Sequence, residues 1–366
     1  MNNNQIINLD YVLPTMRNKL QEYVNISRLI EAPLNYKLYS NAIIVPVSEK
    51  HHKCGVLDNC GNFIDGTHIH EGSCTQIFNG PDLKINDEGK DVIFIGTLHY
   101  IFGHAITDNL KKIWFLYTQQ CKDIIQKGGK VVYLSLTGRP LPNFILRILE
   151  LAGVDINNIT PVDKITRYNN VIVPEDSIKI LKGKGRFYYD EYRKTIEVIK
   201  KNCLNHSLPK YEKVYFSRTA LTKRGRDFGE KRLEKYFQNH GYHIVYPEKI
   251  TLEEQINIVA NCNCFAATES SVSHHAVFCK PNTKMILLQK SNYVNGYTLV
   301  VNAVSKVNVY YVTANYTRIK SEPWKGPFYM DVTKQVGALF KETVYNTKWL
   351  NVEWYKYLAY KYNILL

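Results

Sequence analysis

No apolar run in the sequence approaches the length of about 20 residues that a membrane-spanning helix needs. The N-terminus, MNNNQIINLDYVLP, has neither the basic start nor the apolar core of a secretion signal. We therefore expect a cytoplasmic protein, in which the eight cysteines are free thiols. Internal repeats of solenoid length and low-complexity tracts are also missing, which excludes a repeat protein.

Acidic residues are in deficit. The 33 Asp and Glu residues face 47 Lys and Arg residues, so the net charge is +14 at pH 7. This excess favours a polyanionic partner: nucleic acid, an anionic membrane face or a phosphorylated small molecule. We expect no nucleic-acid partner, because the chain has no recognised nucleic-acid module and its aromatic residues are spread along it. The apolar share of 45% excludes disorder.

The organisation of the chain changes at Asp91. The first 90 residues hold short β-like runs broken by Gly and Asn and no long helical period, which predicts a β-rich arm. From Asp91 onward strands and helices alternate, which is typical of βαβ units and a mostly parallel sheet covered on both faces. Residues Asn205–Pro209 form a linker before a second series of the same kind.

We therefore expect an α/β fold with two Rossmann-like domains facing a cleft. The N-terminal domain spans residues 1–204 and includes the arm at 1–90, and the C-terminal domain spans residues 205–330. Residues 331–366 form a helical segment. Its Trp- and Tyr-rich end, 348–366, is either an interfacial membrane helix or a closing helix packed across both domains, and we favour the closing helix.

The first polar cluster follows the predicted strand at Asp91–Gly96. His104 and Asp108 are four residues apart, so on a helix they share one face and the carboxylate can orient the imidazole. Such a pair at a strand end is a candidate general base. Helix capping by Thr107 or Asp108, with His104 as an ordinary loop residue, is the alternative.

The second cluster, Ser217, Arg218, Lys223 and Arg224, follows the strand that begins at Lys213. Guanidinium groups bind phosphate oxygens in two places, and a loop after a strand adds backbone N–H donors. This predicts a diphosphate site. A solvated basic loop is the alternative.

The third cluster, Glu269, Ser270, Ser271 and His274, lies between a predicted strand and a predicted helix. Small hydroxyl residues at a helix N-terminus suit a diphosphate, and a carboxylate there can accept hydrogen bonds from sugar hydroxyls. A plain series of N-cap residues is the alternative.

Metal sites have little support in the sequence. Cys54, Cys60 and Cys74, with His68 and His70, lack the spacing of a zinc knuckle, and we interpret them as incidental residues of the arm. No Asp-x-Asp motif stands near a strand end, and no G-x-x-x-x-G-K-[ST] phosphate loop occurs. We expect no metal and no tightly bound cofactor.

Three blocks occur in order between residues 90 and 290. The first, Tyr100–Trp114, contains G-H-A-I-T-D-N-L-K-K-I-W, and the second, Val214–Arg218, reads V-Y-F-S-R. The third, Tyr242–Leu288, contains a strand, an L-E-E-Q-I helix, a second strand, a turn of small residues and K-P-N-T-K. Together they resemble glycosyltransferase family 61, which includes bacterial capsular-polysaccharide biosynthesis proteins and eukaryotic xylosyl- and N-acetylglucosaminyltransferases.

Two positions depart from the family pattern. The usual Arg of the first block is a lysine, Lys111 or Lys112. Glu269–Val272 stands where many members have H-G-A-G and is nearer the bacterial E-G-S-A-L-H form.

The resemblance implies a GT-B fold and transfer of a sugar, with inversion, from a nucleotide sugar that we expect to be UDP-linked. It implies donor binding by the C-terminal domain, acceptor binding by the N-terminal domain, and no metal. His104 or Asp108 would be the base, the second cluster and the serines of the third would bind the diphosphate, and Glu269 and His274 would orient the sugar or ribose. The acceptor would be a glycan or lipid-linked glycan of a capsule or other surface polysaccharide, which allows peripheral contact with an anionic inner membrane face.

Three other functions stay open. A polysaccharide pyruvyltransferase would also have two Rossmann-like halves and a basic pocket, but would use phosphoenolpyruvate. A basic nucleic-acid-binding protein would show a steep salt dependence of binding. A degenerate family member would bind the nucleotide without turnover.

Overall fold

The computed structural model describes residues 6–24, 27–47, 54–67, 85–181, 185–205, 207–221, 227–315 and 326–364. The chain divides into two compact units. The N-terminal unit is Arg28–Asn202, and the C-terminal unit joins Met1–Ser27 to Cys203–Leu366. Each unit is built around a sheet with parallel strands, so the predicted α/β class is confirmed.

A six-stranded parallel sheet forms the centre of the C-terminal unit, in the order β1-β17-β16-β15-β12-β14. Its strands are β1 (Ile7–Tyr11), β12 (Lys213–Phe216), β14 (His243–Val245), β15 (Cys264–Thr268), β16 (Lys284–Gln289) and β17 (Asn308–Thr313). β15 is buried along its whole length, because helices cover the sheet on both faces. The strand order reverses at β12, which has β14 on one side and β15 on the other.

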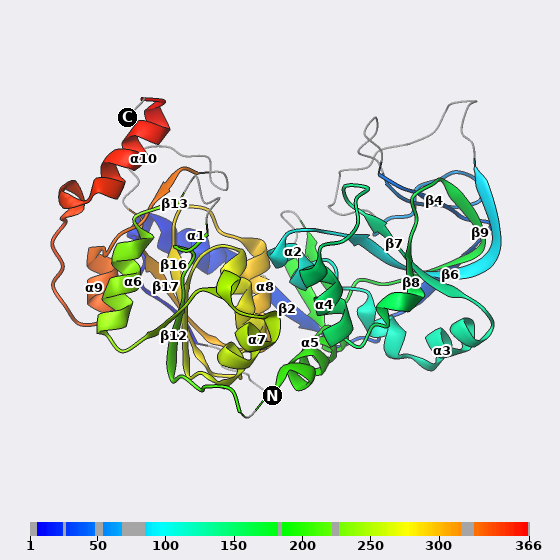
Figure 1. Cartoon of the computed structure of the whole chain (residues 1–366), viewed down its shortest axis with the longest axis horizontal. Helices are drawn as coiled ribbons and strands as arrows, with labels where there is room; N and C mark the ends of the chain where they lie inside the picture. The colour runs from blue at the N-terminus through cyan, green and yellow to red at the C-terminus, as the bar shows by residue number, and fades with distance from the viewer. Residues whose placement is uncertain are drawn as a thin grey trace. The chain divides into compact units, whose positions relative to one another are not determined.

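Helices cover both faces of this sheet, with α6 and α9 on one side and α7 and α8 on the other (Figure 1). The helical elements of the unit are α1 (Pro14–Val24), α6 (Glu230–Asn239), η3 (Pro247–Lys249), α7 (Leu252–Asn261), η4 (Ser271–Phe278), α8 (Gly296–Ser305) and α9 (Lys334–Leu339). A capping box begins α7, with Thr251 and Glu254 each bonded to the other's backbone, as the T-L-E-E sequence at 251–254 indicates.

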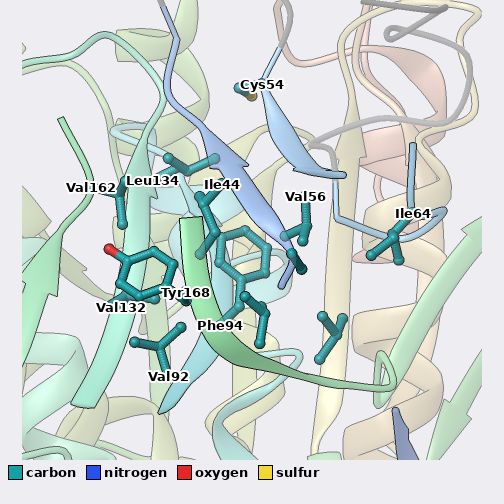
Figure 2. Close-up of a cluster of buried hydrophobic side chains, with 13 residues drawn as sticks. Ile44, Cys54, Val56, Ile64, Val92, Phe94, Val132, Leu134, Val162 and Tyr168 are labelled. Atoms are coloured by element: carbon teal, nitrogen blue, oxygen red, sulfur yellow. The ribbon is translucent and has the colours of Figure 1, made fainter. Parts of the chain in front are cut away.

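The main sheet of the N-terminal unit is mixed. Its strands are β3 (Tyr36–Ser40), β4 (Ile43–Val45), β5 (Gly55–Leu57), β6 (Asn86–Leu98), β7 (Lys130–Ser135), β8 (Ile159–Pro161) and β9 (Thr166–Pro174). The neighbours β9, β6, β7 and β8 are parallel, whereas β3 and β4 pair antiparallel with the other edge of β9, and β5 follows β4. One apolar cluster packs against both the parallel and the antiparallel strands of this sheet, and it includes Ile44, Phe94, Val132 and Tyr168 (Figure 2).

The N-terminal unit also has six helical elements and a small three-stranded sheet among its described residues. The helical elements are α2 (Phe102–Thr107), η1 (Ile113–Tyr117), α3 (Gln119–Gln126), α4 (Asn143–Leu151), η2 (Ile156–Asn158) and α5 (Asp190–Cys203). The small sheet consists of β10 (Ile178–Leu181), β11 (Gly185–Tyr189) and β2 (Ser27–Ile30). The apolar spacing of residues 109–125 predicts one helix, but the structure has two helical elements there. Thr118 ends η1 and caps α3 by accepting a hydrogen bond from the backbone N–H of Cys121, so the chain turns there.

The first 90 residues are not a purely β-rich arm. The strands β3, β4 and β5 agree with the expected antiparallel extension, but α1 is a helix and β1 joins the sheet of the C-terminal unit beside β17. The period of α1 is faint in the sequence, because it buries only Met16 and Leu20. The expected strand at Gln76–Phe78 lies outside the described residues. The expected boundary at 204/205 is close to the division after Asn202.

The tail forms η5 (Lys348–Leu350) and α10 (Val352–Tyr362). Trp354 and Tyr357 are buried and pack with Tyr329, which belongs to a two-stranded ribbon of β13 (Asp227–Phe228) and β18 (Phe328–Tyr329). The tail therefore closes one side of the C-terminal unit, and its packing across two domains stays a prediction. Among the described residues, no helix has the length and apolar character to cross a bilayer.

Two glycines that flank α6 give a matched test of the backbone at the start of this helix. Both have left-handed backbone, with φ of 85° at Gly229 and 80° at Gly241. A Cβ at Gly229 would overlap the carbonyl oxygen of Met330, whereas a Cβ at Gly241 would meet no atom within 4 Å. We expect Gly241→Ala to lower the free energy of unfolding by about 1 kcal/mol through strain alone. Gly229→Ala should lower it by at least about 2 kcal/mol more.

Denaturant unfolding of both variants measures this difference. Equal losses would show that Met330 does not constrain the turn between β13 and α6.

Candidate functional site

Each parallel sheet has one point where the strand order reverses, and ligands of open α/β sheets bind at the carboxyl ends of the strands there. In the C-terminal unit the point lies between β12 and β15, and in the N-terminal unit between β6 and β9. The first predicted cluster follows β6, the second follows β12, and the third follows β15. The first cluster therefore lies at the reversal point of the N-terminal sheet, and the second and third lie at the reversal point of the C-terminal sheet.

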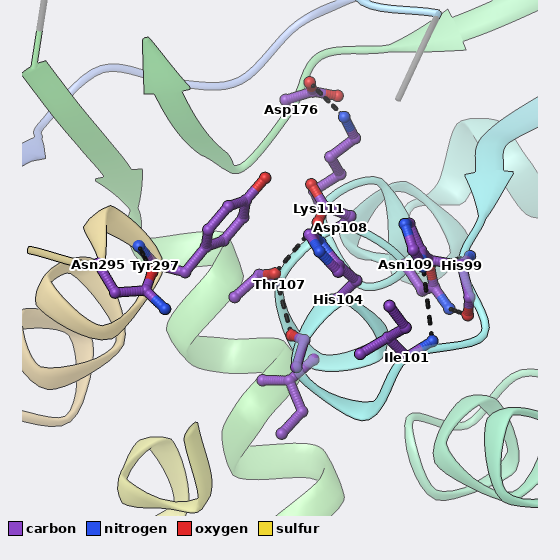
Figure 3. A network of polar contacts seen from close by, with 12 residues as sticks. His99, Ile101, His104, Thr107, Asp108, Asn109, Lys111, Asp176, Asn295 and Tyr297 are labelled. Carbon is purple, nitrogen blue, oxygen red and sulfur yellow. Dashed lines mark hydrogen bonds and ion pairs between the residues drawn. The ribbon is translucent and has the colours of Figure 1, made fainter. Parts of the chain in front are cut away.

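His104 and Asp108 form a close pair in the N-terminal unit (Figure 3). His104 Nδ1 lies 2.5 Å from Asp108 Oδ2, and both side chains are partly buried. The ring of His104 stacks on His99, with 4.1 Å between ring centroids. Asp108 thus fixes the imidazole orientation, and when it accepts the Nδ1 proton, the lone pair of a neutral ring is on Nε2.

The loop that carries this pair is held by buried polar contacts. The side chain of Asn109 accepts a hydrogen bond from the backbone N–H of His99 at 2.8 Å and donates to its carbonyl oxygen at 3.1 Å. Tyr192, which is buried on α5, donates its hydroxyl hydrogen to the carbonyl oxygen of Ile106. These contacts fix both ends of α2, a six-residue helix that could not hold its geometry alone.

Asp176, just after β9, lies between two lysines. Its oxygens are 3.0 Å from Lys111 Nζ and 2.7 Å from Lys112 Nζ. Lys112 is fully buried and also donates to the carbonyl oxygen of Pro174. Burial alone would raise the pKa of Asp176, but the two ammonium groups together lower it. This ion-paired group joins the end of β9 to the segment after Asp108.

Ser217 ends β12 in the C-terminal unit and is fully buried. Its hydroxyl donates to Glu234 Oε2 at 2.7 Å, and Thr219 bonds to the same oxygen. Tyr246 donates to the other oxygen of Glu234. The side chain of Ser217 is therefore part of the turn that shapes the loop after β12.

Arg218 and Lys290 share one carboxylate. Arg218 Nη1 lies 3.2 Å from Asp227 Oδ2, and Lys290 Nζ lies 3.4 Å from the same oxygen. The backbone N–H of Arg218 donates to Glu230 Oε1, which also accepts from the hydroxyl of Tyr215. Burial lowers the pKa of Lys290, and Asp227 opposes that shift. The trio of Arg218, Lys290 and Asp227 has a net charge of +1 when all three groups are ionised.

Glu269 follows β15 and is buried. Burial raises its pKa to about 7, although Lys290 and a hydrogen bond from the backbone N–H of Asn295 act in the other direction. The carboxyl group is therefore about half protonated near neutral pH. It can both donate and accept a hydrogen bond, which suits a sugar or ribose hydroxyl.

The remaining residues of the third cluster form the start of η4. Ser270 precedes this 3₁₀-helix without a side-chain cap bond, and Ser270 and Ser271 are partly exposed. His274 is buried, and its Nε2 lies 3.4 Å from Thr298 Oγ1. Ser270 therefore occupies the N-cap position that the alternative interpretation gave it, but its hydroxyl donates to the carbonyl oxygen of Thr268 and does not cap the helix.

Several predicted residues lie outside the described part of the chain. They are Lys223, Arg224, His68, His70 and Cys74. Among the described residues, no three His, Cys, Asp or Glu side chains gather as metal ligands. Cys54 is buried near Thr97, and Cys60 is exposed.

Sequence reasoning missed Asp227, Lys290 and His99 as members of the clusters. Lys290 follows β16 directly, so the strand-end rule could have found it. Asp227 has no such signal, because its contact with Lys290 joins residues 63 positions apart.

Comparison with protein-family models matches residues 102–286 to the family described as Glycosyltransferase 61. The match covers just over half of the chain and runs from α2 into β16, so it contains all three polar clusters. The resemblance inferred from the sequence is therefore confirmed. No curated protein matches the chain.

The raised pKa of Glu269 predicts a pH-dependent stability. A carboxyl group with a pKa of about 7 in the folded protein and an ordinary value of 4.5 stabilises the fold below pH 4.5. That contribution is lost as the pH rises through 7. We expect Glu269→Gln to gain about 3 kcal/mol of unfolding free energy relative to the wild type between pH 4.5 and pH 8.

Denaturant unfolding at the two pH values measures this change, with Glu248→Gln as an exposed control in the same unit. A constant difference between Glu269→Gln and wild type would contradict the assigned burial of the charge.

Proposed function

The chain belongs to glycosyltransferase family 61, and from this premise we propose that it transfers a sugar from a nucleotide sugar to a glycan hydroxyl, with inversion at the anomeric carbon. Membership in the family supports glycosyltransferase activity. The polar groups at the strand ends support the finer assignments of donor, base and leaving-group stabilisation. The single observation that carries them is the placement of all three clusters within the matched residues and at the carboxyl ends of parallel strands.

In this proposal the C-terminal unit binds the donor. Arg218 and Lys290 bind the diphosphate, aided by the serine turn at Ser270 and Ser271. Glu269 binds a ribose or sugar hydroxyl, and His274, which is buried, helps to orient the sugar or ribose. We propose a GT-B arrangement and a UDP-linked donor on the basis of family resemblance.

The N-terminal unit supplies the base. His104 has the geometry of an imidazole oriented by a carboxylate, and the base must be neutral before it accepts a proton. We assign the proton-accepting role to Nε2 of His104 and the orienting role to Asp108. Asp108 stabilises the imidazolium that forms, as a carboxylate does in hydrolase triads.

The reaction balances without a further reagent. The acceptor oxygen forms a bond to the anomeric carbon while its proton passes to His104 Nε2. The bond from the anomeric carbon to the diphosphate oxygen breaks, and its electron pair leaves with the nucleoside diphosphate. Arg218 and Lys290 stabilise the charge that develops on that oxygen. In this scheme protein cations do the work of a divalent ion, and we propose that transfer is metal-independent.

The proposed acceptor is a glycan or lipid-linked glycan of a capsule or other surface polysaccharide. The motif around Glu269, which is nearer the bacterial form, supports this choice. The charge of +14 also suits an anionic acceptor such as a lipid-diphosphate-linked glycan.

Removal of the base should abolish transfer but spare donor binding. We expect His104→Ala to lower kcat by about 10²–10⁴-fold, because proton removal by a placed base contributes that much. His240→Ala is the matched control, since His240 also faces a carboxylate, with Nε2 3.1 Å from Glu342 Oε1, but lies at the end of α6. Transfer assays give kcat, and calorimetry gives the affinity for nucleoside diphosphate.

Wild-type kcat in His104→Ala would remove His104 as the base. A large loss in Asp108→Ala alone would assign the base role to the carboxylate.

The two cations of the C-terminal unit should control diphosphate affinity. We expect Arg218→Ala and Lys290→Ala each to weaken nucleoside diphosphate binding by about 10-fold or more, since charged hydrogen bonds contribute about 1.5–3 kcal/mol. Lys231→Ala removes an exposed cation from α6 and should leave the affinity unchanged.

A panel of nucleoside diphosphates, nucleotide sugars and phosphoenolpyruvate, scored by the shift in melting temperature, tests the ligand class. Stabilisation by phosphoenolpyruvate alone would replace the proposal with pyruvyl transfer.

A further inference from the structure

The end of the chain exposes apolar side chains that the proposed reaction does not use. Of the sixteen large apolar side chains exposed among the described residues, eight lie within the twenty residues 345–364. They are Tyr345, Trp349, Leu350, Val352, Tyr355, Tyr360, Tyr362 and Ile364. Leu350 is 86% exposed and Val352 is 63% exposed. Single exposed apolar residues are ordinary, but a cluster of this kind marks an interaction surface.

The cluster follows from the two faces of α10. Trp354 and Tyr357 point inward and pack with Tyr329, so the helix is anchored by one face. Val352, Tyr355 and Tyr362 are spaced by three and seven residues, which places them on another face, and all three are exposed. A helix that closes a domain and meets only water usually has a polar outer face, whereas here three apolar side chains lie exposed beside Lys356. We call these three residues, with Trp349 and Leu350, the aromatic face.

Charge identifies the occupant of the aromatic face. Lys356 and Lys361 lie on the same helix, and Glu353, the acidic residue of α10, lies 3.1 Å from Lys356. With a net charge of +14, two copies of the chain repel each other, whereas an anionic surface attracts each copy. Trp and Tyr are the side chains that prefer the boundary between lipid headgroups and hydrocarbon, because each has an apolar ring and a polar atom.

We propose that the aromatic face seats the protein on an anionic lipid bilayer. Trp349, Leu350 and Val352 enter the boundary between headgroups and hydrocarbon, and Lys356, which is 55% exposed beside them, contacts a lipid phosphate. The contact is peripheral and reversible, and the buried side chains Trp354 and Tyr357 stay in the protein. This inference is independent of the proposed transfer reaction, because no residue of the three strand-end clusters takes part in it.

Vesicle sedimentation tests the proposal with the full-length chain. We expect the wild type to bind vesicles of phosphatidylcholine with phosphatidylglycerol, and to bind pure phosphatidylcholine much less. Leu350→Glu with Val352→Glu should weaken binding by about 10-fold or more, because two apolar side chains no longer enter the bilayer. The matched control is Tyr36→Glu with Leu38→Glu, an exposed apolar pair on β3 of the N-terminal unit.

An unchanged melting temperature and unchanged nucleoside diphosphate affinity show that the variants stay folded and keep the donor site. The proposal is overturned if the wild type binds neither kind of vesicle. It is also overturned if the control double variant on β3 loses as much binding as the double variant at Leu350 and Val352. Self-association of the wild type that the Leu350 and Val352 changes abolish, without vesicle binding, would instead assign the face to a second copy.

Discussion

One carboxylate held between two cations recurs at the carboxyl ends of the strands in both units. Asp176 faces Lys111 and Lys112 after β9, and Asp227 faces Arg218 and Lys290 beside the ends of β12 and β16. Burying a charge costs several kcal/mol unless a partner compensates it, so each trio can exist only as a set. A trio with one carboxylate also retains a positive charge when fully ionised. The arrangement thus fixes cations at strand ends, where parallel α/β sheets bind their ligands.

The two trios differ in the exposure of one cation, Arg218, whereas Lys290 and Asp227 are as buried as the members of the first trio. Lys111, Lys112 and Asp176 are each at least 85% buried, and their contacts join the end of β9 to the segment after the His104 pair. Arg218 keeps 27% of its side chain exposed, and Asp227 holds it from behind. The first trio therefore connects the end of β9 to the segment that carries the His104 pair. In the proposed function, the second trio presents the partly exposed guanidinium of Arg218 to the diphosphate, already held in place by Asp227.

Local patterns in the sequence were sufficient for much of the fold. The bounds of α6 and the cap of α7 follow from short-range chemistry, and the strand-end rule found His104, Arg218 and Glu269. The rest depends on distant partners or on weak periodicity. The strand β1 pairs with β17 across some 300 residues, and α8 buries seven of its ten residues, so it shows little amphipathic period. The contact between Asp227 and Lys290 depends on the fold and could not be predicted from residue spacing.

The residues that match the family and the residues outside the match are held by different kinds of contact. Residues 102–286 contain all three strand-end clusters, where hydrogen bonds from partners such as Asn109 and Glu234 hold the loops in place. The strand β1 and the helix α10 lie outside that stretch. The strand β1 is held by its backbone pairing with β17, and α10 is held by the apolar packing of Trp354 and Tyr357. The exposed side of α10 makes no such packing contact, so folding alone does not explain its aromatic side chains. The proposed contact of this positively charged chain with an anionic lipid surface does explain them.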